Sequence, residues 1–69
     1  MTQSERVLDH LQRHGSITQM ESTDLYGIMR LGARIYELKK DGVPIDKEMV
    51  EAENRYGDKV HFARYFLTD

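Results

Sequence analysis

Two arginines and a glutamate, Arg30, Arg34 and Glu37, are the side chains in this sequence best suited to recognising a ligand. An arginine can donate two parallel hydrogen bonds to a guanine edge or to a phosphate, and a glutamate can accept one from the amino group of cytosine. Ala33 is small enough to allow close approach or to contact a thymine methyl group. These residue types favour contact with duplex DNA. The other interpretation is that Arg30 and Arg34 are solvated surface charges that pair with Glu37 or with the acidic residues further along the chain.

The segment 28–42 must be helical to place these side chains together. Large aliphatic residues recur at Ile28, Leu31, Ile35 and Leu38, which is the spacing of one buried stripe on an amphipathic helix. At roughly 100° per residue, Arg34 lies on one shoulder, and the face opposite the stripe carries Met29, Arg30, Ala33, Tyr36, Glu37 and Lys40. Gly42 suits the left-handed conformation that closes a helix, so we expect a helix over about 29–41.

A second, short helix is expected over about 19–25, and its start could contact a nucleic acid. The free backbone amides of that first turn, together with the side chains of Thr18 and Gln19, could bind a phosphate. Glu21 stands three residues after Thr18, which is the spacing of a capping box. Plain helix capping therefore explains Thr18 equally well.

Residues 47–67 change to a strand-like pattern and predict a β-hairpin. Two runs, 47–54 and 60–67, flank a turn in which Gly57 suits the hairpin loop. We expect one face of the hairpin to meet the helices, namely Val50, Ala52, Ala63, Tyr65 and Leu67. Phe62 and Phe66 would then be partly exposed, which suits a dimer contact.

The hairpin turn carries a third group of candidate binding residues, Arg55, Tyr56 and Lys59. Such residues suit a wing that contacts the DNA backbone or the minor groove. The same residue types are also ordinary at exposed turn tips, so both interpretations stay open.

Catalytic or metal chemistry has little support in the sequence. His10 and His14 are four residues apart, which could bring two imidazoles to one metal ion, yet no third ligand stands at a suitable spacing. We therefore expect surface histidines. There is no cysteine, no glycine-rich phosphate loop and no nucleophile motif, and Tyr26, Tyr36 and Tyr65 are expected to pack. The sequence predicts neither an enzyme nor a cofactor.

The 69 residues predict one small domain with an uneven distribution of charge. Ten Lys and Arg stand against 12 Asp and Glu, a formal net charge of −2, which counts mildly against nucleic-acid binding. Basic residues dominate in 29–42, however, while the acidic excess lies in 1–28 and 43–53. No apolar run is long enough for a signal peptide or a membrane span, so a soluble cytoplasmic protein is expected.

The remaining segments complete an α+β fold. A first helix is expected over about 4–14, with Ser4 or Thr2 as its cap, because Thr2 and Glu5 have capping-box spacing and Gly15 ends the apolar pattern. The dipeptide 16–17 is interpreted as a short link. Three helices followed by a β-hairpin wing form a winged helix-turn-helix arrangement, here a single domain over residues 1–69.

Several segments also resemble one family, the small winged helix-turn-helix proteins common in phages and prophages. They are residues 15–19, 26–28 and 34–38, Gly42 with 44–45, then 54–57 and 63–65. The resemblance covers most of residues 7–67 and implies binding to DNA.

Fold and residues together predict a sequence-specific, duplex DNA-binding protein of phage type. It would act as a homodimeric transcription regulator in the cytoplasm of the host cell, through helix 29–41 and the wing. A second interpretation is a phage-encoded module that inhibits or tethers a host protein, such as a nuclease or a defence complex. Its motivation is the acidic hairpin with Glu48, Glu51 and Glu53, which would repel DNA if it faced the same way as the helix.

Overall fold

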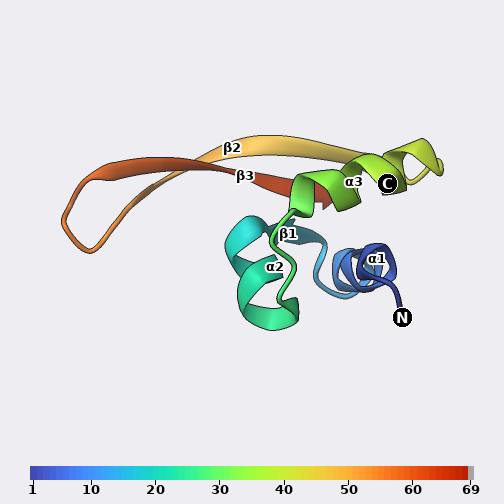
Figure 1. The fold of residues 1–69 in the computed structure, drawn as a ribbon. Coiled ribbons are helices and arrows are strands. Elements are labelled where there is room, and N and C mark those ends of the chain that lie inside the picture. Colours follow the sequence, from blue (N-terminus) through green and yellow to red (C-terminus); the bar gives the residue numbers. More distant parts are fainter. Residues whose placement is uncertain (69) are drawn as a thin grey trace.

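Three helices and a three-stranded antiparallel sheet make up residues 1–68, which are the residues that the computed structural model describes. The elements are α1 (Gln3–His14), β1 (Ser16–Thr18), α2 (Gln19–Tyr26), α3 (Leu31–Lys40), β2 (Ile45–Glu53) and β3 (Lys59–Leu67). The strand order is β1-β3-β2, and the outer half of the β2–β3 hairpin projects beyond the helices (Figure 1). This is the predicted α+β arrangement of three helices and a β-hairpin.

Both predicted capping boxes are present and fix where α1 and α2 begin. The Thr2 hydroxyl accepts from the Glu5 N–H at 3.1 Å, and the Glu5 carboxylate accepts from the Thr2 N–H at 2.8 Å. Thr18 and Glu21 make the same reciprocal bonds at 3.2 and 2.9 Å. Each box satisfies two backbone donors that a helix start leaves free. Loss of such a cap costs about 1 kcal/mol.

Gly42 closes α3 as predicted. Its φ of 96° lies in the left-handed region that glycine adopts without steric cost. The Val43 N–H donates to the Leu38 carbonyl and the Gly42 N–H to the Lys39 carbonyl, both at 3.0 Å. This pair of bonds is a Schellman motif, which satisfies carbonyls that the last turn would leave free.

Eight buried aliphatic side chains form one core: Val7, Leu11, Ile17, Ile28, Leu31, Ile35, Leu38 and Ile45. The four residues of the predicted stripe in 28–38 are all among them, so this prediction is confirmed. α1, β1 and β2 supply the others, which means that α3 packs against elements from both ends of the chain. Truncating a fully buried leucine such as Leu31 to alanine would cost about 2–5 kcal/mol.

The dipeptide 16–17 is part of a strand, where a link was expected. β1 pairs antiparallel with β3, and Ile17 lies opposite Tyr65 with no exposed surface. A strand of three residues has too few positions to show an alternating pattern. Its partner is at the other end of the chain, so only the tertiary structure reveals the pairing.

The hairpin faces differ from the expected assignment. Val50 pairs with Phe62, and Ala52 with Val60. Directly opposite residues share one face of a sheet, so Val50 and Ala52 lie on the face of Phe62 and Val60, and the expectation that they share the face of Tyr65 was wrong. Ala63, Tyr65 and Leu67 do share a face, and the last two pack against the core as expected. Phe62 is 37% exposed and Phe66 half-buried.

Two aromatic positions also differ from expectation. His10 is only 2% exposed and its Nδ1 lies 2.7 Å from the Tyr26 hydroxyl, so it is not a surface histidine, whereas His14 is exposed. Tyr36 is 67% exposed and is therefore not a packing residue. His10 lies at the border of a helical stripe, where the pattern alone does not decide between core and solvent, whereas Tyr36 lies on the face of α3 opposite the buried stripe.

Candidate nucleic-acid interface

The exposed surface of α3 is the first part of the candidate interface. Tyr36 and Met29 are 67% and 71% exposed, Lys40 is exposed and Ala33 is half-buried. α3 begins later than predicted, so Met29 and Arg30 lie in the turn before it. Arg30 occupies the N-cap position, but its side chain makes no capping hydrogen bond. A large apolar side chain and a cation are thus presented at the start of the helix.

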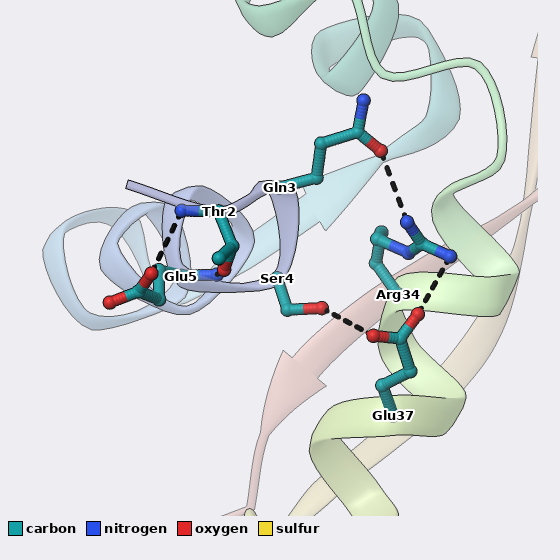
Figure 2. Close-up of polar contacts among 6 residues, drawn as sticks. All are labelled: Thr2, Gln3, Ser4, Glu5, Arg34 and Glu37. Carbon is teal, nitrogen blue, oxygen red and sulfur yellow. Dashed lines mark hydrogen bonds and ion pairs between the residues drawn. The ribbon is translucent and has the colours of Figure 1, made fainter.

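The side of α3 that faces α1, which we call the α1 flank, holds Arg34 and Glu37. Arg34 Nη2 lies 2.6 Å from Glu37 Oε1, and Arg34 Nη1 donates to Gln3 Oε1 at 3.2 Å (Figure 2). The Ser4 hydroxyl donates to Glu37 Oε2 at 3.0 Å. The Arg34 side chain is 29% exposed, so this pair is partly removed from water. Both charges are therefore engaged inside the domain and tie α3 to the first turn of α1.

Gln19 connects the start of α2 to the start of α3. Its amide oxygen accepts from the Leu31 N–H at 3.0 Å, and its amide nitrogen donates to the Ile28 carbonyl and the Thr23 hydroxyl, each at 2.9 Å. The amide thus replaces the missing cap of α3 from a neighbouring helix. Gln19 and Thr18 were candidates for phosphate contact, but the Thr18 hydroxyl caps α2 and the Gln19 amide fixes the turn between the two helices.

The opposite side of α3, which we call the β2 flank, opens into a groove. Tyr36 and Lys39 from α3 and Lys47 from β2 line it, with Tyr65 at its base, and its volume is about 260 Å³. A Cβ atom at Gly32 would lie 3.8 Å from the Tyr65 hydroxyl, an ordinary van der Waals distance, so Gly32 borders the groove beside that hydroxyl. Two ammonium groups beside phenolic hydroxyls form a suitable surface for a phosphate.

Sequence reasoning missed Lys39 and Lys47 as site residues. Lys39 lies one turn of helix after Tyr36, on the side of α3 between the outer face and the buried stripe. A helical wheel that selects only the outermost residues as base contacts therefore omits it. Lys47 was counted within an acidic segment, although it is the only cation among residues 43–53. The signal that could have found it is its position at the start of β2, beside α3.

Ion pairing separates the cations of residues 1–68 into two groups. Arg13, Arg34, Lys59 and Arg64 pair with carboxylates of the chain. The cations without an ion pair among these described residues are Arg6, Arg30, Lys39, Lys40, Lys47 and Arg55. Apart from Arg6 on α1, they lie at the two ends of α3, at the start of β2 and at the hairpin tip. Positive charge available to a partner is thus concentrated on α3 and the hairpin.

The hairpin tip, residues 54–58, presents Arg55 and Tyr56 to solvent, and Tyr56 is 80% exposed. Asn54 Oδ1 accepts from the backbone N–H groups of Tyr56 and Asp58 at 2.9 and 3.1 Å, which holds the turn. Lys59 lies 3.5 Å from a carboxylate oxygen of Glu51. At about 3.3 Å per strand residue, the tip lies roughly 25 Å along the hairpin from the groove. The tip and the groove are therefore two separate parts of the surface.

Two of the four acidic residues of β2, Glu48 and Glu51, are paired within the hairpin. Glu48 pairs with Arg64, and Glu51 lies 3.5 Å from Lys59 and 3.3 Å from His61. By register, Glu48 lies on the sheet face opposite that of Glu51. The hairpin therefore lacks the continuous acidic face that its sequence suggests, and its repulsion of a phosphate backbone is reduced.

Within residues 1–68, no helix has the length and apolar character that crossing a membrane requires. The same residues contain no cluster of three or more His, Cys, Asp or Glu side chains arranged to hold a metal ion. The rings of His10 and His14 do lie close together, with centroids 4.5 Å apart and planes tilted by 47°, and the His10 ring also makes an edge-on contact with Tyr26.

A helix-turn-helix with a β-hairpin beside it defines a class of domain that inserts its second helix into the major groove of DNA. The chain belongs to the winged helix-turn-helix domain family, which it matches over residues 2–69. Domains of this family typically bind DNA without catalysing a reaction, so membership suggests that DNA is the partner. Comparison with curated proteins gives no match to this chain.

Proposed function

We propose that this protein binds duplex DNA sequence-specifically, with α3 in the major groove. The observation that carries the proposal is the concentration, within residues 1–68, of unpaired cations on α3, the start of β2 and the hairpin tip, while most other cations pair with carboxylates of the chain. A DNA-binding surface needs cations whose counterions can be exchanged for phosphates. Cations already held by carboxylates contribute little to that exchange.

The proposed interface has three parts with different tasks. Met29, Arg30, Ala33, Tyr36 and Lys40 face the bases or the groove edges. Lys39 and Lys47 hold a phosphate in the groove on the β2 flank, and Arg55 and Tyr56 contact the backbone or the adjacent minor groove, joined by Lys59 where it exchanges Glu51 for a phosphate. Thr18, Gln19, Arg34 and Glu37 hold α3 at its angle, and their contacts within the domain support that role.

The proposed biological role is transcription regulation of phage type, in the cytoplasm of the host cell. A homodimer is part of this proposal, because helix-turn-helix dimers bind two half-sites about one helical turn apart. A domain of 69 residues also gains stability from association. The alternative role, binding of a host protein through the acidic hairpin, has less support, since Glu48 and Glu51 pair within the hairpin.

The test is selection of bound duplexes from a random DNA pool at low salt, with the mass of the complex measured in solution. We expect a consensus with two-fold symmetry, and an affinity that falls steeply with salt. Arg30→Ala should relax the consensus. Arg6→Ala is the matched control, since it removes an unpaired cation from α1 and should leave the consensus unchanged. Failure to enrich any sequence, or equal effects of both variants, would contradict the proposal.

A further inference from the structure

The β3 edge that continues beyond β1 is an open stretch of sheet. β1 pairs with residues 64–66 of β3 only, so 59–63 have no strand partner on that side within residues 1–68. The Leu67 N–H donates to the Gly15 carbonyl on this edge at 3.3 Å. Because hydrogen-bonding direction alternates along an antiparallel strand, the backbone groups of His61 and Ala63 point to the same edge. They form a template for one more strand.

The two outer edges of the sheet are protected to different degrees. The free edge of β2 carries five charged side chains, Asp46, Lys47, Glu48, Glu51 and Glu53, which discourage pairing with another chain. The open stretch of β3 reads Lys59-Val60-His61-Phe62-Ala63 and holds one permanent charge, on Lys59, which pairs with Glu51. Val60 and Phe62 are 39% and 37% exposed. This edge therefore carries fewer of the charged side chains that discourage strand addition than the free edge of β2 does.

α2 stands beside this edge and forms a groove with it. Met20, Thr23 and Asp24 line one wall and Val60, His61 and Phe62 the other, around a volume of about 570 Å³. That volume lies within the range of about 300–1,000 Å³ typical of ligand sites. Met20 is 73% exposed, so an apolar side chain entering the groove would cover apolar surface on both walls.

The charge of the α2 wall indicates which charge the ligand should carry. α2 contains Glu21 and Asp24 but no Lys or Arg. The Glu21 carboxylate is engaged in its capping box, whereas Asp24 has no ion-pair partner in the part of the chain that is described. A basic side chain next to the apolar ones would complement this wall.

The geometry points to a binding site for an extended peptide segment of a partner protein, added antiparallel to β3 in line with β1. The segment alternates apolar residues with a Lys or Arg that meets Asp24. Backbone bonds to His61 and Ala63 supply affinity, and the groove between α2 and β3 supplies selectivity. The site uses the sheet edge opposite β2, so a peptide and DNA on the β2 flank can bind together.

Panning of a random linear heptapeptide library against the full chain, with excess duplex DNA present, tests this inference. We expect enriched peptides with alternating apolar residues and one Lys or Arg, and we expect bound peptide to shift the backbone amide resonances of His61 and Ala63. N-methylation of the alternate peptide amides that face β3 should weaken binding by about tenfold or more, whereas methylation of the outward amides should not.

Variants of the exposed wall complete the test without touching the core. Asp24→Lys should weaken the selected peptide by about tenfold, while Asp9→Lys on α1 serves as the charge-matched control. No enrichment, equal effects of the two methylation patterns, or displacement of the peptide by duplex DNA would overturn the inference. So would a concentration-dependent dimer that blocks the groove, because the occupant would then be a second copy of this chain.

Discussion

The two flanks of α3 both carry charged side chains but differ in what those charges contact. On the α1 flank, Arg34 and Glu37 contact each other and the first turn of α1. On the β2 flank, Lys39 and Lys47 face an open groove and have no carboxylate partner within residues 1–68. One helix therefore uses its charged residues for two tasks. A cation on a predicted recognition helix is available to DNA only where the neighbouring element offers it no partner.

The largest expected effect concerns the β2 flank. The double variant Lys39→Ala/Lys47→Ala should lower affinity for duplex DNA by about 30-fold at low salt, or about 2 kcal/mol. It should also reduce the slope of log affinity against log salt concentration by about two. Fluorescence anisotropy over a salt series measures both. The far-ultraviolet circular dichroism spectrum should stay unchanged, and an unchanged salt slope would remove these lysines from the interface.

Gln19 should show the opposite behaviour, since its amide acts on the fold. Gln19→Ala removes the cap of α3 together with two donated bonds, and we expect a loss of about 2 kcal/mol in the free energy of unfolding. Urea unfolding measures this loss. Gln19→Glu is the informative comparison, because it keeps the acceptor for the Leu31 N–H but loses the donors to Ile28 and Thr23. If Gln19→Ala left stability unchanged and weakened only DNA binding, Gln19 would be a phosphate contact.

A smaller effect is expected on the α1 flank. Arg34→Ala should destabilise the domain by about 1 kcal/mol, because the pair with Glu37 is only partly buried. DNA affinity of the folded protein should change far less than in the lysine double variant. Parallel urea unfolding and anisotropy separate the two quantities. A large loss of affinity at unchanged stability would show that Arg34 leaves Glu37 to reach DNA, and the distinction between the flanks would fail.

The smallest expected effect is a pH dependence of stability that arises at the start of α1. This first turn also contains Gln3 and Ser4, which contact Arg34 and Glu37. The Thr2 backbone N–H, assisted by the Thr2 hydroxyl, lowers the pKa of the Glu5 carboxyl below its ordinary value of 4.5. A lowered pKa stabilises the fold above the ordinary value, and this stabilisation is lost as pH falls through the lowered one. Glu5→Gln should therefore reduce Tm at neutral pH, and the difference should shrink below about pH 4.5. A Tm difference that is constant with pH would contradict this.

Local interactions explain why much of the fold could be predicted. The capping boxes at Thr2 and Thr18 and the glycine at position 42 act over three to five residues, so their spacing is visible in the sequence. The helical stripe at 28–38 is also local, and it identified α3 as the element that packs against the others. Local signals were weaker where one residue could serve either core or solvent, as at His10.

The sequence by itself thus determined the helices, their ends, the buried stripe and the presence of a hairpin. Only the tertiary structure decided which charges are free, because ion pairs such as Arg34 with Glu37 and Glu48 with Arg64 depend on packing and on strand register. It also revealed β1 and the role of Gln19, whose partners belong to other elements. Contacts between elements depend on how those elements pack and on the strand register. The spacing of the contacting residues along the sequence does not reveal either of these.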